Sequence, residues 1–213
     1  KSKHLLFIFI HAILVVSFAL FIRFLQYQPT TADNSQEQES TDAQQIQIPI
    51  FPNDPIIGDK KAPLTLVLFG DLACGGCQEQ DDFLAKLLEK YPKKIKIIWK
   101  GLPVHNFPVP SRAAHAYGFC ANEQNKFNEF KTMAFANKEN LSPETLKILT
   151  GKTGLNPEKL AECLASPRPE TYAKTTEDLA TLLNIQTVPT FFINNIQIQH
   201  PQTVEGWEAL LQL

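Results

Sequence analysis

Apolar residues from residue 46 onward follow two different spacings. The run "LTLVLF" at 64–69 and the run "IKIIW" at 95–99 are short and apolar, which is typical of buried strands. Between these runs, apolar residues recur as on one face of a helix that Pro92 ends, at Phe83, Leu84, Leu87, Leu88 and Tyr91. A strand, a helix and a second strand joined by a short return predict a parallel βαβ unit.

The middle of the chain, about 111–184, has no strand pattern and predicts three or four helices. Two of them begin with the same signal, a capping residue followed by proline and glutamate, at Ser142 and at Asn156. A further helical stretch opens at Pro169 and ends near Asn184. These segments form a helical block that interrupts the strands.

Strand patterns return after the helical block. The sequence "TFFINNIQI" at 190–198 predicts two strands around a turn at Asn194 and Asn195, and a short helix follows from about Thr203. The order is therefore strand, helix, strand, helical block, hairpin and helix. We predict an α/β domain over residues 46–213 with an inserted helical subdomain at about 103–184.

The first residues of the chain form an apolar segment. Residues 5–22 carry no formal charge, and Phe24 and Leu25 extend the run to the roughly 20 residues that a bilayer core requires. A cleaved signal peptide, the alternative, has a shorter core followed by small residues, whereas bulky residues stand here. We predict that residues 1–27 are a signal-anchor with one transmembrane helix, in which residues 5–25 anchor the chain in the membrane.

The residues around the apolar segment set the expected orientation and compartment. Lys1 and Lys3 precede the segment, so the positive-inside rule places this end in the cytoplasm and the rest of the chain outside. Residues 28–45 are polar and without large apolar side chains, which predicts a flexible linker. The cysteines then lie on the oxidising side, where disulfides persist. With 20 basic and 22 acidic residues, the chain has no dense basic surface for nucleic acid.

The sequence Cys74-Gly75-Gly76-Cys77 stands between the first predicted strand and the predicted helix. A cysteine at a helix N-terminus faces unpaired N–H groups and the positive end of the helix dipole, which favour its thiolate. Cys74 is therefore the candidate nucleophile. Cys77, one turn further along, is the candidate resolving thiol that breaks a mixed disulfide.

A metal site and a structural staple are the other interpretations of this CGGC sequence. Zinc requires four ligands, and a C-x-x-C pair usually comes with a second Cys or His pair. Cys120 and Cys163 are isolated from each other, and no His pair lies near them. A disulfide that closes so short a loop restrains the unfolded chain little. We therefore expect a redox centre with no metal and no cofactor, and a soft-metal chaperone for Cu(I) is the rival from another class.

Three stretches together give the chain a resemblance to a known family. They are "GDKKAPLTLVLFGDLACGGC", "LPVHNFPVPSRAAHAYGFCANEQNKFNEF" and "LNIQTVPTFFINN". Over about residues 50–212 the chain resembles the thioredoxin superfamily, specifically the DsbA-like thiol–disulfide oxidoreductases of bacterial envelopes. The resemblance implies a thioredoxin-like fold, with Cys74 as nucleophile and Cys77 as resolving thiol. It also implies that Pro189 is a cis-proline facing them, with Val188 before it, where an extended substrate segment binds.

The chain departs from the family pattern at two places. The family commonly has proline, often followed by an aromatic residue or His, between its cysteines, whereas both residues here are glycine. No His stands there to donate to the thiolate, so we expect a weaker oxidant than the most oxidising members. Relatives often have a buried acid six residues before the first cysteine, where it assists deprotonation of the resolving thiol. Leu68 stands there instead, and Asp71 is the nearest acid.

Cys120 and Cys163 are expected to form a structural disulfide between two helices of the insertion, because the domain is exported and some relatives carry a similar pair. Two buried free thiols, or a second redox pair that relays electrons, are the alternatives. His105 and His115 also fall in the insertion. We interpret each as a packing or capping residue.

The residues and the resemblance predict an extracytoplasmic thiol–disulfide oxidoreductase that forms disulfides in exported proteins. The expected partners are cysteine-containing exported proteins and a membrane redox partner. The expected location is the bacterial cytoplasmic membrane, with a single pass and the catalytic domain outside. A disulfide reductase or isomerase that a membrane partner keeps reduced is the alternative within the same chemistry.

Overall fold

The computed structural model describes residues 14–24 and 47–213. It divides the chain into two compact units, Lys1–Gln45 and Ile46–Leu213. Residues 14–24 form a helix in the first unit, and the rest of the predicted anchor and the whole predicted linker lie outside the described residues. Within the two described ranges, no helix combines the length and the apolar character needed to cross a membrane.

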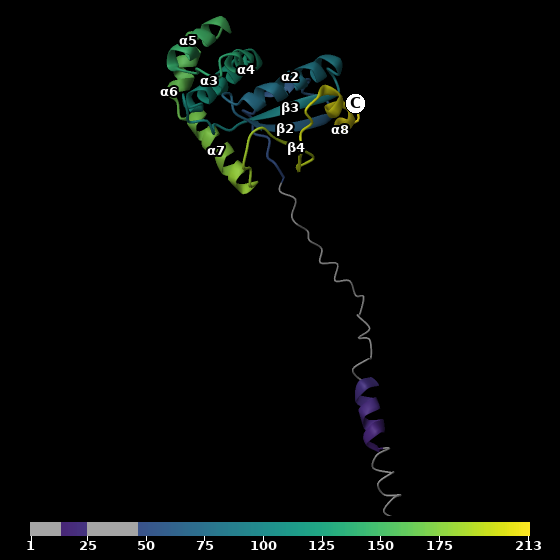
Figure 1. Ribbon diagram of the computed structural model, residues 1–213. Coiled ribbons are helices and arrows are strands. Elements are labelled where there is room, and N and C mark those ends of the chain that lie inside the picture. The colour runs from purple at the N-terminus through teal and green to yellow at the C-terminus, as the bar shows by residue number, and fades with distance from the viewer. Residues whose placement is uncertain (1–13, 25–46) are drawn as a thin grey trace, which may run out of the picture. The chain divides into compact units, whose positions relative to one another are not determined.

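A five-stranded sheet with the order β1-β3-β2-β4-β5 forms the centre of the second unit (Figure 1). Its strands are β1 (Ile56–Gly58), β2 (Leu64–Gly70), β3 (Ile95–Gly101), β4 (Thr190–Ile193) and β5 (Ile196–Ile198). The two apolar runs form β2 and β3, which are parallel and pair Leu64 with Ile95, so the predicted βαβ unit is confirmed. The hairpin is also confirmed, because Asn194 and Asn195 turn the chain with positive φ between β4 and β5.

The described residues of the second unit also form seven helices. They are α2 (Gly75–Lys90), α3 (Arg112–Glu123), α4 (Phe127–Ala136), α5 (Pro143–Lys152), α6 (Pro157–Ala165), α7 (Arg168–Leu182) and α8 (Val204–Leu211). The five from α3 to α7 lie between β3 and β4 in the chain and form the helical insertion. The predicted number of three or four helices is wrong, because Asn125 adopts a positive φ and separates α3 from α4. Ser142 and Asn156 cap α5 and α6 through side-chain oxygens that accept backbone N–H bonds, as their sequences predict.

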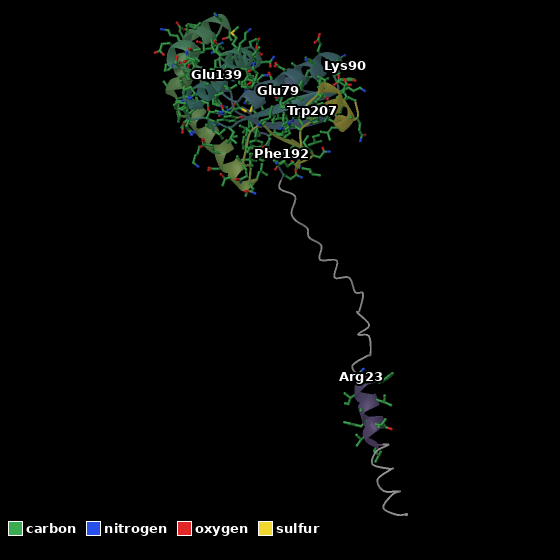
Figure 2. The ribbon with its side chains drawn as sticks, viewed as in Figure 1. Arg23, Glu79, Lys90, Glu139, Phe192 and Trp207 are labelled. Atoms are coloured by element: carbon green, nitrogen blue, oxygen red, sulfur yellow. A yellow bond between two sulfur atoms is a disulfide. The ribbon has the colours of Figure 1, made fainter. Side chains whose placement is uncertain are left out.

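The two faces of the sheet carry separate hydrophobic clusters. One cluster contains the buried residues of α2, α8 and most of the insertion, and the other contains residues of α7 and of the segment before β1. Figure 2 marks one member of each cluster, Trp207 and Phe192. The Trp207 indole donates to the Gln80 amide oxygen at 2.9 Å, which fixes α8 to α2.

A disulfide joins two helices of the insertion. Cys120 in α3 and Cys163 in α6 are bonded at 1.98 Å across 43 residues of sequence. Both cysteines are buried beside Phe119 and Tyr172. Closing a loop of this length removes entropy from the unfolded chain, which stabilises the fold by about 4 kcal/mol on the loop-entropy model.

A buried ion pair ties the segment before β1 to the sheet and to the insertion. The ammonium of Lys100 in β3 lies 2.5 Å from Asp54 and donates to the Pro49 carbonyl at 2.7 Å. The hydroxyl of Tyr172 in α7 donates to the same Asp54 carboxylate at 2.7 Å. A buried charge is tolerated only when it is paired and hydrogen-bonded, and here both conditions are met. The incoming chain is therefore fixed against the domain that carries the candidate site.

Candidate functional site

The CGGC sequence lies at the carboxyl end of β2, the central strand. Cys74 is the N-cap residue of α2, and its Sγ accepts a hydrogen bond from the Cys77 N–H at 3.1 Å. Both cysteines are free thiols, with Cys74 exposed by 6% and Cys77 by 0%. The helix N-terminus predicted for the first cysteine is thus where the structure places it.

The pKa values of the two thiols are shifted in opposite directions. The pKa of Cys74 is lowered to about 7, first by its hydrogen bond with the Cys77 side chain. Burial opposes this effect, whereas the Cys77 backbone N–H and the positive charge of His105 add to it. The pKa of Cys77 is raised, above all by burial and then by its interaction with Cys74. The lowered pKa favours the thiolate of Cys74 near neutral pH, whereas the raised pKa keeps Cys77 protonated.

The loop before β4 faces the thiol of Cys74. The peptide bond between Val188 and Pro189 is cis, as the resemblance implies. The Cys74 Sγ lies 3.7 Å from the Val188 carbonyl oxygen. Gly76 also lies close to this loop, because a Cβ placed on it would be 3.6 Å from Pro189 Cδ. The four residues named from the resemblance are thus brought together from segments more than 100 positions apart.

Asp71, in the turn between β2 and α2, is buried, and both of its carboxylate oxygens accept hydrogen bonds. One carboxylate oxygen accepts from the Ala73 N–H at 2.9 Å. The other accepts from the N–H groups of Val104 and His105 and from the Ser111 hydroxyl, at 2.7, 2.8 and 2.8 Å. This carboxylate therefore holds the loop after β3 against the turn that carries the cysteines.

Two histidine rings complete the surroundings of Asp71. His105 Nδ1 lies 3.2 Å from one carboxylate oxygen, and His115 Nε2 lies 3.3 Å from the other. His115 is buried, and a Cβ on Gly101 would lie only 2.6 Å from its ring, so a side chain at this glycine would displace the ring. The packing role inferred for His115 fits this position. His105 is different, because 38% of its side chain is exposed beside the cysteine turn.

Asp71 is poorly suited to replace the acid that is missing at Leu68 as proton acceptor for Cys77. Burial by itself raises the pKa of Asp71, but its hydrogen bonds with His115, Ala73 and His105 outweigh burial and hold the pKa well below the usual range. A carboxylate of low pKa whose oxygens are already occupied is a poor base. Asp71 meets Cys77 through its backbone instead, where its N–H lies 3.5 Å from the Cys77 Sγ.

This network is not predicted by the sequence, in which Asp71 is recognisable only as the acid nearest to Cys74. One signal was present, namely an acid placed directly after a buried strand, at the sheet edge where functional loops gather. Among the described residues, no group of three or more His, Cys, Asp or Glu side chains is arranged to hold a metal.

We expect Asp71→Asn to lower the free energy of unfolding at pH 7 by about 2 kcal/mol, because buried donors of the loop lose their acceptor. The folded-state pKa of Asp71 lies below its ordinary value of 3.8. The stability from this carboxylate is therefore complete above that value and is lost as the pH falls below it. Urea unfolding between about pH 3 and 7 should show less acid destabilisation in the variant than in the wild type.

The matched control is Asp178→Asn, which removes an exposed carboxylate paired with Lys174 on the surface of α7. We expect it to change the free energy of unfolding by no more than about 0.5 kcal/mol. An Asp71→Asn protein with wild-type stability at neutral pH and an unchanged acid profile would show that Asp71 does not anchor the loop.

Comparisons with known proteins place the chain in a family. A family model described as thioredoxin matches residues 51–212. The Na(+)/H(+) antiporter NhaA 3 of Salinispora tropica is 26% identical over 77% of this chain, which spans only 25% of the antiporter's length. Disulfide bond formation protein D of Bacillus subtilis is 25% identical, and the match covers 78% of this chain and 79% of that protein.

A solved structure shows the same fold. The periplasmic thioredoxin-like protein from Salmonella enterica serovar Typhimurium superimposes with a TM-score of 0.66 at 25% identity, covering 78% of this chain and 97% of that one. The matched region includes the CGGC sequence, the helical insertion and the cis-proline loop. The chain therefore belongs to the thioredoxin family, and its fold is that of the DsbA-like oxidoreductases.

Proposed function

We propose that the chain is a thiol–disulfide oxidoreductase that forms disulfides in exported proteins, with Cys74 and Cys77 as its catalytic residues. The observation that carries the proposal is the difference between these two thiols. Cys74 stands at the start of α2 with a pKa lowered to about 7, whereas the pKa of Cys77 behind it is raised. Cys74 is thus suited to be the nucleophile of thiol–disulfide exchange, and Cys77 to be the resolving thiol.

The proposed reaction moves two electrons from a substrate dithiol to the cysteine pair. A substrate thiolate attacks the Cys74 sulfur of the oxidised centre, the Cys74–Cys77 bond breaks, and the departing Cys77 takes up a proton. The substrate is then joined to Cys74 by a mixed disulfide. Its second thiolate attacks the substrate sulfur of this bond, so that Cys74 leaves as thiolate and the substrate is oxidised.

The loop of Val188 and Pro189 is proposed to bind the substrate segment around its cysteine. The Val188 carbonyl lies 3.7 Å from the Cys74 sulfur. An extended peptide that bonds to the backbone of this loop brings its own cysteine to the thiol, and the affinity then comes from main-chain groups rather than from side chains. Such binding suits an enzyme whose substrates differ in sequence.

A reductase or isomerase that a membrane partner keeps reduced is the second candidate. It is favoured by the acidity of Cys74, because a pKa of about 7 matches the roughly 7 of thioredoxin rather than the roughly 3.5 of DsbA. A less stabilised thiolate makes a weaker oxidant.

The reduction potential of the cysteine pair, equilibrated against glutathione, separates the two candidates. We expect a value between the roughly −120 mV of DsbA and the roughly −270 mV of thioredoxin, because the thiolate is only moderately stabilised. A value at the thioredoxin end would contradict disulfide donation and favour the reductase.

We also propose that the chain is anchored in the bacterial cytoplasmic membrane through residues 5–25, with a membrane redox partner that recharges the centre. Support comes from the apolar side chains of residues 14–24, most of which are well exposed around the whole helix, for example Leu14, Phe18 and Phe21. Alkaline carbonate washing of membranes should leave the full chain in the pellet. Release of the chain into the wash would exclude the anchor.

Single cysteine variants test the catalytic roles. We expect Cys74→Ser to lose oxidation of a dithiol peptide and to form no mixed disulfides. In Cys77→Ser the Cys74 thiolate can still attack a disulfide of the substrate, and we expect the resulting mixed disulfide to accumulate because no Cys77 thiol is present to break it. Non-reducing electrophoresis and mass spectrometry of the trapped species measure both outcomes.

The control is the double variant Cys120→Ser/Cys163→Ser, which removes the buried disulfide and leaves Cys74 and Cys77 in place. It should still oxidise the peptide, with a lower melting temperature. Wild-type turnover by Cys74→Ser would refute the assignment of the nucleophile.

A further inference from the structure

The CGGC sequence leaves Cys74 without help from the residues between the cysteines. Gly75 and Gly76 have no side chains, so they can bring neither a donor nor a charge to the thiolate. Within this sequence, the Cys77 side chain, the Cys77 backbone N–H and the N-terminus of α2 favour a thiolate there. A positive group from another part of the chain would add to this effect.

We propose that His105 supplies that positive charge and that Asp71 positions it. The loop after β3 then takes the role that a positively charged side chain between the two cysteines would have. The part that this plays in disulfide exchange rests on the function proposed above. His105 is a positioning residue for the thiolate in this proposal, because the structure gives no hydrogen bond between its ring and Cys74.

His105 is fixed at its backbone and at its ring. Its N–H donates to Asp71 at 2.8 Å, and its carbonyl accepts from the Ser111 N–H at 2.9 Å. Its Nδ1 lies 3.2 Å from the same Asp71 oxygen. With 38% of the side chain exposed, the ring can still exchange a proton with water. The imidazole is thus held in place while part of it stays in contact with water.

Asp71 is connected to both cysteines as firmly as to His105. Its carbonyl accepts from the Cys74 N–H at 3.1 Å, and its N–H lies 3.5 Å from the Cys77 Sγ. Asp71 therefore contacts the imidazole, the backbone of Cys74 and the thiol of Cys77.

Charges of both signs act on Cys74. The positive charge of His105, in the loop after β3, lowers the pKa of Cys74 by more than the negative charge of Asp71, in the turn after β2, raises it. Lys138, after α4, is the rival cation, because its Cε would lie 3.6 Å from a Cβ on Gly75. Its ammonium is 3.5 Å from Glu139, which offsets its charge.

Loss of the imidazole would remove a positive charge that lowers the pKa of Cys74. The Asp71 carboxylate would keep its contact with His115, and its negative charge would still raise the pKa of Cys74. Loss of the positive charge of His105 therefore disfavours the thiolate.

His105→Gln in the reduced full chain tests the proposal, with the backbone contacts to Asp71 retained. The readouts are the ultraviolet absorbance of the thiolate and the rate of alkylation by iodoacetamide as functions of pH. Both report Cys74, because Cys77 is buried with a raised pKa. We expect the pKa of Cys74 to rise by about half a unit or more, which lowers the thiolate fraction at pH 6 about threefold.

Two variants serve as controls. His200→Gln makes the same change at a ring that packs on Phe191, away from Asp71, and should leave the titration of Cys74 unchanged. Lys138→Gln tests the rival cation and should have a smaller effect than His105→Gln. The equilibrium with glutathione at pH 7 should also shift toward the disulfide by about 1.5-fold in His105→Gln, because the reduced form loses stabilisation.

An unchanged titration of Cys74 in His105→Gln, or a larger change in Lys138→Gln, would overturn the proposal. If His105→Gln did not fold, the wild-type alkylation profile would decide. It should show an imidazole ionisation in addition to that of the thiol, and a fit to one ionisation alone would also overturn the proposal. These measurements need no substrate, so they are independent of the Cys74→Ser and Cys77→Ser experiments that test the oxidoreductase function.

Discussion

The buried carboxylate of Asp71 is the interaction on which the site depends. A charge without exposure to water must be hydrogen-bonded to be tolerated, and this one accepts from the turn after β2, from the loop after β3 and from Ser111. The hydrogen bonds that stabilise the carboxylate therefore also hold these three segments in place around the two cysteines. Because these bonds also lower its pKa, the residue is an anchor and not a proton carrier.

Around this anchor, the chemistry of the thiols is divided between the two parts of the domain. The βαβ unit gives Cys74 its place at a helix N-terminus and buries Cys77 behind it. The insertion brings His105 and His115 to the same carboxylate, and the loop before β4 brings the cis-proline. The difference in pKa between these two neighbouring thiols thus follows from their hydrogen bond, from burial and from groups on other elements, although the two glycines between the cysteines contribute no side chain.

The insertion is fixed to the rest of the domain by buried polar contacts as well as by its core. Lys131 in α4 pairs with Asp81 in α2, and the ion pair of Lys100 with Asp54 reaches α7 through Tyr172. Such pairs contribute little net free energy, but they are directional and need one particular arrangement of the helices. A site assembled from both parts requires that arrangement, because a shift of the insertion would move His105 relative to Cys74.

The sequence by itself determined the features that local bonding and burial encode. The apolar runs gave β2 and β3, Ser142 and Asn156 marked two helix starts, and the position of Cys74 before α2 pointed to a nucleophile. The tertiary structure decided the rest. β1 is too short to show a period, and the long helical stretch after Ser111 divides where Asn125 adopts a positive φ. Asp71 contacts partners 33 to 44 residues away, and a hydrogen bond over that separation leaves no periodic trace in the sequence.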